Sequence, residues 1–248
     1  MPRLPLICLM TALALFVAVP PARADEAVTP TQKRAFEQII HDYILQHPEL
    51  VIEALQSAED KMKAQAEASA RAAVAEKRQE LLDDPTSPIA GNPKGDVTIV
   101  EFFDYRCPYC KQVEPALEAL LKEDRQLRII YKELPVLGKD SVYATRVALA
   151  ARKQGKYERF HGAMMATKGQ IDEKVILQVA ATAGLDTERL KSDMQAGDID
   201  DIIKRNYDLA QALDLHGTPG FVIGGEVVPG AIDIATLKQK VAAARKSG

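Results

Sequence analysis

Residues 101–110 read EFFDYRCPYC, and this stretch decides the fold that the sequence predicts. It begins inside a short apolar run, Val97 to Phe103, whose β-branched and aromatic residues indicate a buried strand. A helical pattern from Pro108 to Lys122 follows directly. Cys107 and Cys110 therefore stand where a predicted strand gives way to a predicted helix.

This placement of Cys107 favours redox chemistry. Near a helix N-terminus, free backbone N–H groups and the positive end of the helix dipole stabilise a thiolate. A thiolate is the attacking form in disulfide exchange, and the spacing allows Cys110 to close back onto the first sulfur. Pro108 suits the first helical turn because the N–H that it lacks would be unsatisfied there.

The alternatives for the pair are half of a zinc site and an incidental pairing. A structural zinc site needs two further Cys or His ligands at suitable spacing. The chain has no second cysteine pair, and its four histidines are scattered: His41, His47, His161 and His216. The sequence therefore favours a redox pair, and we expect neither a cofactor nor a resident metal.

Residues 1–24 are predicted to be a secretory signal peptide. Arg3 supplies a basic start, Leu4 to Val19 an apolar stretch, and Ala22-Arg23-Ala24 a small-x-small cleavage site. An uncleaved anchor is the alternative, but about 16 apolar residues are marginal for a membrane span. Lipidation is less favoured, because Cys8 lies inside the apolar run.

Removal of residues 1–24 leaves 30 basic residues against 35 acidic ones, a formal charge of −5. This negative net charge does not indicate a protein that binds nucleic acid or an anionic membrane surface. No later apolar stretch is long enough to cross a bilayer. Only Cys107 and Cys110 remain, and two cysteines so close together make no structural disulfide framework.

Residues 25–84 are predicted to form a helical segment, with Thr31 as N-cap and a break at His47-Pro48. Its apolar residues recur at helical spacing: Phe36, Ile39, Ile40, Tyr43 and Ile44, then Leu50, Val51, Ala54, Leu55, Ala58 and Met62. This stripe packs either on the following domain or on copies of itself, as an oligomerisation stalk. The periodicity leaves both possibilities open.

Residues 85–96 are predicted to be a linker, because Asp83 to Ser87 and Pro88 are turn-forming residues. Residues 97–248 are predicted to form an α/β domain with a mixed sheet. After the first helix come a second strand at Leu127 to Tyr131, a helical insert at about 139–213, a hairpin at Gly224-Gly225 and a final helix from Ile232 to Ala244.

Three further residues could join the cysteines. Pro219 follows Thr218 just before the hairpin, where a proline can hold a cis peptide in a tight turn. Glu101 lies in an apolar strand, either as a buried acid–base group or as a surface position on the other face. His216 is a metal or proton group if it approaches the pair, and otherwise a surface histidine.

EFFDYRCPYC followed by Gly217-Thr218-Pro219 closely resembles the DsbA-like branch of the thioredoxin superfamily. The resemblance covers residues 97–248 and implies a thioredoxin fold with an inserted helical domain in a thiol–disulfide oxidoreductase. It implies an exposed nucleophile at Cys107, a buried resolving thiol at Cys110 and a cis Pro219 facing them.

The same resemblance assigns roles to the surrounding residues. Thr218 would shape the environment of the thiolate, and Glu101 would be the buried acid–base carboxylate. Thr218 and Pro219, together with Pro108 and Tyr109, would bind the substrate peptide. Tyr109 departs from the DsbA dipeptide, in which histidine at this position helps tune the thiolate.

Residues 40–50, IHDYILQHPEL, are similar to the N-terminal extension of proteins of the suppressor-of-copper-sensitivity C (ScsC) type, which mediates oligomerisation. This similarity implies a homo-oligomer, a dimer or trimer, through residues 31–82. It also implies a periplasmic disulfide isomerase or reductase that acts on unfolded or misoxidised proteins and is kept reduced by a membrane-bound thiol reductase.

Three functions follow from these observations, in order of preference. The first is the isomerase or reductase. The second is a DsbA-like oxidase for which the helical segment is incidental. The third is a Cu(I)-binding protein that uses Cys107 and Cys110 as soft thiolate ligands.

Overall fold

The computed structural model describes residues 28–247. The predicted signal peptide and Cys8 lie outside the described residues. The chain divides into two compact units, one ending at Ala58 and the other beginning at Glu59, and each is described by itself. No helix within residues 28–247 has the length and apolar character needed to cross a membrane.

The first unit begins with helix α1, Pro30–Gln46, which is closed by a capping box. The Thr29 side chain accepts a bond from the Gln32 N–H, and the Gln32 side chain reaches back to the Thr29 backbone. The predicted cap at Thr31 is therefore wrong by two residues, because Pro30 already occupies the first helical turn. The predicted break is confirmed: α1 ends at Gln46 and α2, Glu49–Glu76, begins after Pro48.

The apolar stripe of α1 and α2 contains no buried residue. Its large members are exposed in the described chain: Phe36, Ile39, Ile40, Tyr43, Ile44, Leu50, Val51, Leu55 and Met62. Large apolar side chains exposed at helical spacing are typical of helices that pack against a partner. The helical prediction for this segment is thus confirmed, and within residues 28–247 nothing covers its apolar face.

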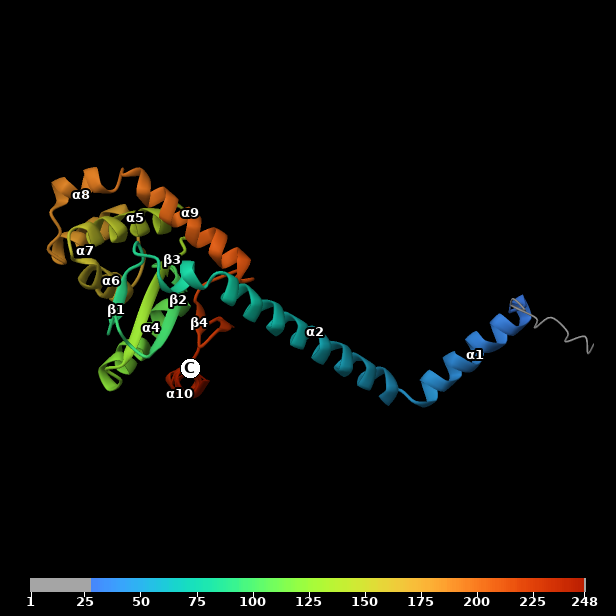
Figure 1. Ribbon diagram of the computed structural model, residues 1–248. Helices are drawn as coiled ribbons and strands as arrows, with labels where there is room; N and C mark the ends of the chain where they lie inside the picture. Colours follow the sequence, from blue (N-terminus) through green and yellow to red (C-terminus); the bar gives the residue numbers. More distant parts are fainter. Residues whose placement is uncertain (1–27, 248) are drawn as a thin grey trace, which may run out of the picture. The chain divides into compact units, whose positions relative to one another are not determined.

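The second unit is built on a five-stranded sheet in the order β1-β3-β2-β4-β5. Its strands are β1 Ile89–Gly91, β2 Val97–Phe103, β3 Leu127–Glu133, β4 Gly220–Ile223 and β5 Glu226–Pro229. The central pair β2 and β3 is parallel, joined through helix α4, Pro108–Glu123, and the other pairs are antiparallel (Figure 1). The predicted mixed sheet is confirmed.

The segment predicted as a linker, residues 85–96, contains strand β1. Its residues pair antiparallel with β3, with Ile89 opposite Ile130. Just before it, helix α3, Arg78–Leu82, buries Leu81 in the core of this unit. The turn-forming residues up to Pro88 do form a loop. Ile89 and Ala90, which follow this loop, belong to a short strand at the edge of the sheet. The sheet domain therefore extends further toward the N-terminus than the composition indicated.

Five helices separate β3 from β4, where the helical insert was predicted. They are α5 Lys139–Lys153, α6 Tyr157–Ala166, α7 Glu173–Thr182, α8 Thr187–Asp193 and α9 Gly197–Ala212. The chain ends with α10, Ile234–Ser247, after the β4–β5 hairpin. Gly224 and Gly225 in that hairpin have φ angles of 58° and 85°, the left-handed conformation that a two-residue turn of this type requires.

Alternate residues of β2 belong to two different hydrophobic clusters, because successive side chains of a strand point to opposite faces of the sheet. Ile99 and Phe103 belong to the cluster that includes residues of α4, α10 and helices of the insert. Val100 and Phe102 belong to the cluster that includes Leu81 of α3 and residues of α9. Glu101 shares the parity of Ile99 and Phe103, so it lies on the same face of the sheet as α4.

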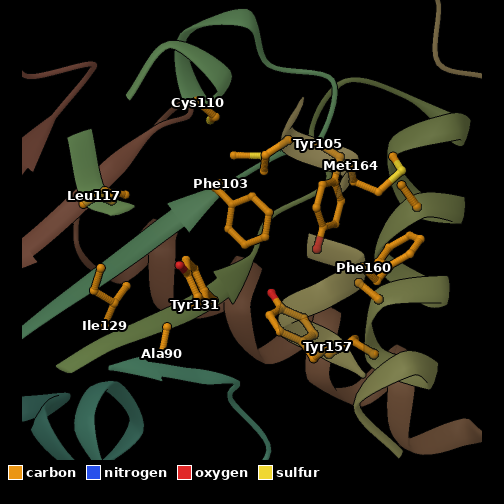
Figure 2. Close-up of a cluster of buried hydrophobic side chains, with 14 of the residues drawn as sticks. Ala90, Phe103, Tyr105, Cys110, Leu117, Ile129, Tyr131, Tyr157, Phe160 and Met164 are labelled. Carbon is orange, nitrogen blue, oxygen red and sulfur yellow. The ribbon is translucent and has the colours of Figure 1, made fainter. Parts of the chain in front are cut away.

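Aromatic side chains join the sheet to the insert. Phe103 meets Tyr105 edge-on, with ring centroids 5.0 Å apart, and Tyr131 lies 5.8 Å from Phe103. Tyr157 and Phe160 of α6 reach into the same cluster (Figure 2). The helical insert and the sheet thus share one hydrophobic core.

Candidate active site

Cys107 occupies the N-cap position of α4. Its backbone is extended, with φ −73° and ψ 118°, and its Sγ accepts from the backbone N–H of Cys110 at 3.4 Å. Pro108 fills the first helical position, as predicted. A sulfur at an N-cap faces unsatisfied N–H groups, which favours its negative form.

The Thr218–Pro219 peptide bond is cis, and it lies beside this helix start. The register explains the approach: Phe102 of β2 pairs with Gly220 of antiparallel β4, so the end of β2 and the beginning of β4 share one edge of the sheet. The Cys107 thiol donates to the Thr218 carbonyl oxygen at 3.2 Å. The structure thus brings together the two motifs that the sequence singled out.

The two thiols have opposite acidities. The Cys110 thiol, hydrogen-bonded to Cys107, lowers the pKa of Cys107 to about 6 against the opposing effect of burial, and the Thr218 side chain also lowers it. The same bond, together with burial, raises the pKa of Cys110 far above its ordinary value. Cys107 is therefore a thiolate at neutral pH while Cys110 keeps its proton, as a nucleophile and a resolving thiol require.

The expected exposure of Cys107 needs correction. The residue is only 4% exposed, and Cys110 is fully buried. The loop carrying Thr218 covers the sulfur of Cys107. Pro108 and Tyr109 are exposed, with Tyr109 at 60%. These two side chains therefore form the surface beside a nearly covered sulfur.

Glu101 is fully buried on β2, so the alternative of a surface position is wrong. Among the described residues, neither of its carboxylate oxygens has a hydrogen-bond partner. Burial, followed by the charges of Glu114 and Cys107, raises the pKa of Glu101 well above its ordinary value. Its charge also raises the pKa of Cys110, which shows that carboxyl and thiol influence one another.

His216 does not belong to the site. Its side chain is 79% exposed, and its Nε2 lies 2.8 Å from an oxygen of Asp214 in the same loop. The interpretation as a surface histidine is confirmed. Within the described residues, no group of three or more His, Cys, Asp or Glu side chains is arranged to hold a metal ion.

A buried polar network beneath the site went unpredicted. Glu133, at the end of β3, accepts hydrogen bonds from Tyr157 at 2.8 Å, Thr145 at 2.9 Å and Tyr105 at 3.2 Å. Burial raises the pKa of Glu133 to about 8 against these three donors, which lower it. An acidic residue at the end of the apolar run LRIIYKE was the available signal, of the same kind as Glu101.

Two other buried polar residues extend this network toward α4. The ring Nδ1 of His161 lies 3.2 Å from the Tyr105 hydroxyl, and its Nε2 lies 3.4 Å from Oε1 of Glu114. His161 and Glu114 come from α6 and α4, respectively. Neither residue carries a local motif, so only the packing of the two helices reveals their proximity.

Comparison with known proteins agrees with this geometry. Residues 98–242 match the family model of the DSBA-like thioredoxin domain, and residues 32–65 match that of the copper resistance protein ScsC N-terminal domain. The thiol:disulfide interchange protein DsbA of Bordetella parapertussis is 28% identical over 56% of this chain and 68% of its own length. The chain spans only 25% of the length of the first curated relatives that it matches, Na⁺/H⁺ antiporters NhaA of Salinispora species.

Solved structures give the same assignment. A thioredoxin-like oxidoreductase from Silicibacter pomeroyi DSS-3 is 46% identical, with a TM-score of 0.68 over 69% of this chain and 99% of its own. Proteus mirabilis ScsC in a transitional conformation is 27% identical, with a TM-score of 0.67 over 89% of this chain and 100% of its own. The chain thus belongs to the family of DsbA-like thioredoxin-domain proteins and carries an N-terminal domain of the ScsC type.

Proposed function

We propose that this protein is a periplasmic thiol–disulfide oxidoreductase that isomerises or reduces wrong disulfides in misoxidised proteins. The observation that carries the thiol–disulfide chemistry is the pair of opposite thiols: a Cys107 whose pKa is lowered to about 6, beside a Cys110 that keeps its proton. The exposed apolar stripe of α1 and α2 supports assembly into an oligomer.

The reaction begins at Cys107. Its thiolate attacks one sulfur of a client disulfide, forms a mixed disulfide and expels the other client sulfur as a thiolate. In isomerisation, a client thiolate then attacks within the client and releases Cys107. In reduction, Cys110 attacks Cys107 Sγ, and the client leaves as a thiolate while a Cys107–Cys110 disulfide forms.

Glu101 serves the reductive branch. Cys110 must lose its proton before it attacks, and the buried carboxyl of Glu101 is the nearby group whose charge already influences that thiol. Its carboxylate form accepts the proton and becomes neutral, the form that burial favours. A membrane-bound thiol reductase would return the disulfide to two thiols.

The apolar stripe would bring several sites together. Helices with such a face associate with copies of themselves, which buries the stripe and closes the assembly. A dimer or trimer formed in this way can hold one client against more than one Cys107. Isomerisation needs repeated attack on the same client, so effective concentration at a second site raises its rate.

Reactivation of scrambled, fully oxidised ribonuclease tests the proposal. The full-length protein is compared with Leu55→Asp, which places a charge in the stripe, and with Gln56→Asp as a matched control on the next residue of α2. We expect Leu55→Asp to lower both the oligomeric mass and the reactivation, while Gln56→Asp changes neither. A Leu55→Asp monomer with full reactivation would make the helical segment incidental.

The same experiment includes Cys107→Ser and a shortened chain. Cys107→Ser should abolish exchange. A chain starting at Glu59 is preferable to one starting near Pro85, because Leu81 belongs to the core and Lys132 bonds to Asp84. Retained activity in Cys107→Ser would contradict the proposal.

A DsbA-like oxidase is the second candidate, and the acidity of Cys107 favours it. A thiolate stabilised in the reduced form makes the corresponding disulfide a stronger oxidant. Rapid oxidation of a reduced client by the monomer, with weak reactivation of scrambled ribonuclease, would support this reading. Cu(I) binding needs both sulfurs as thiolates, and the raised pKa of Cys110 opposes it.

A further inference from the structure

A cavity of about 690 Å³ opens beside the start of α4. It lies between α4 and the loop that joins α6 to α7, on the insert side of the cysteines. Arg106 and Pro108, the two neighbours of Cys107, are part of its lining. Anything bound in this cavity is therefore close to the reacting sulfur.

The walls of the cavity are largely apolar. Pro108 and Pro115 contribute from α4, and Met165 and Ile171 contribute from the end of α6 and the following loop. Such walls suit the hydrocarbon part of a long side chain, which can lie along them while a polar head reaches further.

Two of the cations on the lining are already engaged. The Lys111 ammonium donates to the carbonyl oxygens of Met164 at 2.8 Å and Thr167 at 2.6 Å, where the last turn of α6 leaves its carbonyls free. Arg106 donates to the carbonyl of Leu137 at 2.7 Å. Lys168 lies on the exposed loop at the rim, where solvent screens its charge.

Among the residues that line the cavity, Glu114 has a carboxylate without a full set of partners. The residue is 6% exposed, and its Oε2 is buried with no hydrogen-bond partner in the part of the chain that the structure describes. Its Oε1 lies 3.4 Å from His161 Nε2. Buried carboxylate oxygens need donors, so this position is suited to an incoming cation. Glu118, one helical turn further on, adds a second carboxylate to the lining.

We propose that this cavity is a specificity subsite for a lysine or arginine side chain of the client, close in sequence to the reacting cysteine. The alkyl part of that side chain lies along the prolines, and its cationic head donates to Glu114. The proposal rests on the proposed disulfide exchange and adds the class of client. An extended chain advances about 3.3 Å per residue, so a basic residue within about three positions of the cysteine can reach the cavity.

The test uses peptides that carry one cysteine as a mixed disulfide with thionitrobenzoate. Attack of Cys107 on the peptide sulfur forms the Cys107–peptide disulfide and releases coloured thionitrobenzoate, so absorbance gives the rate. The peptides differ at one position, one to three residues from the cysteine on either side, and carry lysine, acetyl-lysine or glutamate there. Acetyl-lysine keeps the stem and removes the charge.

At the favoured position we expect the lysine peptide to react about tenfold faster than the acetyl-lysine peptide, a difference of about 1.4 kcal/mol. Glu114→Gln should bring this ratio close to one. Glu123→Gln removes a carboxylate from the exposed end of α4, outside the cavity, and should leave the ratio high. A similar fall in both variants would assign the preference to overall charge and overturn the subsite.

The remaining outcomes separate the subsite from the proposed function. Equal rates for lysine and acetyl-lysine at every position, or a preference for glutamate, would overturn the subsite and leave disulfide exchange intact. No release from any peptide, while iodoacetamide still alkylates Cys107, would overturn the exchange function itself. The wild-type peptide series decides the question even if Glu114→Gln fails to fold.

Discussion

The thiol of Cys107 donates to the carbonyl oxygen of Thr218 at 3.2 Å, across a separation of 111 positions in the sequence. This bond uses the thiol proton, so it belongs to the protonated form of Cys107. The Cys110 thiol and the Thr218 side chain favour the thiolate form. The loop before β4 therefore contacts the nucleophile and affects its acidity.

The first prediction concerns the acidity of Cys107. In the reduced protein, its alkylation by iodoacetamide should rise with pH through a midpoint near 6, because only the thiolate reacts. Cys110→Ala removes the donor that lowers the pKa most, so the midpoint should move toward the ordinary value of 9.0. Stopped-flow alkylation between pH 4 and 10 measures both midpoints, and a wild-type midpoint above 8 would contradict the assignment.

The same acidity predicts a pH dependence of stability. The folded-state pKa of Cys107 lies below the unfolded one, so the folded state loses its proton first as pH rises. The stabilising contribution is complete above about pH 9 and is lost as pH falls through about 6. Urea denaturation of the reduced protein and of Cys107→Ala isolates this contribution: the unfolding free energy of the wild type relative to that of the variant should rise between about pH 6 and 9.

The second prediction concerns Glu101, whose carboxyl group is buried and has no hydrogen-bond partner within residues 28–247. Burying a polar group that makes no hydrogen bond costs folding free energy. Replacement of Glu101 by leucine removes that cost and should raise the free energy of unfolding by about 1–3 kcal/mol. It should also slow the attack of Cys110 on a mixed disulfide by about 100-fold, because the proton acceptor is gone. Urea denaturation and single-turnover release of a client measure the two effects. A variant that loses stability and keeps its rate would refute this role for Glu101.

The third prediction concerns Glu133, whose pKa is raised to about 8 in the folded state, mainly by burial. A carboxyl with a raised folded pKa supports folding below about pH 4.5, and this support is lost as pH rises through 8. The contribution of Glu133 to the unfolding free energy should therefore decline over this range by a few kcal/mol, as an order of magnitude. Glu133→Gln should reduce the decline, whereas the exposed Glu158→Gln should not. Identical slopes in all three proteins would exclude the shift.

The fourth prediction concerns the ion pair between Lys132 and Asp84, at 3.1 Å. Lys132 is 1% exposed, and its other partner is the carbonyl of Glu80 at 2.7 Å. Asp84→Asn leaves a buried ammonium without a counterion and should cost about 3–5 kcal/mol of unfolding free energy. Lys132→Met should lower the unfolding free energy by less than Asp84→Asn does, because Asp84 keeps its hydrogen bonds to Thr86.

An exposed pair provides the control for this comparison. Lys240 and Glu226 form an ion pair near the surface, and Lys240→Ala should cost less than about 1 kcal/mol. Chemical denaturation of the three variants gives the order directly. Equal losses of unfolding free energy in Asp84→Asn and Lys240→Ala would show that the pair of Lys132 and Asp84 contributes no more to stability than a surface pair.

Much of the second unit could be predicted from local patterns. The apolar run before Cys107, the helical pattern after it and the Gly224-Gly225 turn each have a short-range physical cause. Strand β1 escaped prediction because three residues between turns carry almost no periodicity. The cap at Thr29 was missed because Pro30 and Thr31 both resemble helix starts.

The residues of the candidate site also fall into two groups, those that the sequence predicts and those that it does not. Cys107, Cys110 and Thr218-Pro219 lie in motifs, and the structure brings them together. Glu114 and His161 could not be predicted, because their proximity depends on how α4 packs against α6. Polar residues on an amphipathic helix ordinarily face water, and only the tertiary arrangement shows that these two do not.

The hydrogen bonds of Glu133 bear on whether the chain can be shortened to a minimal thioredoxin fold. Excision of residues 139–212 would remove Thr145 and Tyr157, two of the three donors to its carboxyl group, and also Asn206, which donates to its backbone carbonyl at 3.0 Å. A carboxyl at the end of a central strand would then lose most of its donors. The insert is therefore a structural part of the sheet domain, and a scaffold engineered from this chain has to retain it or rebuild β3 without Glu133.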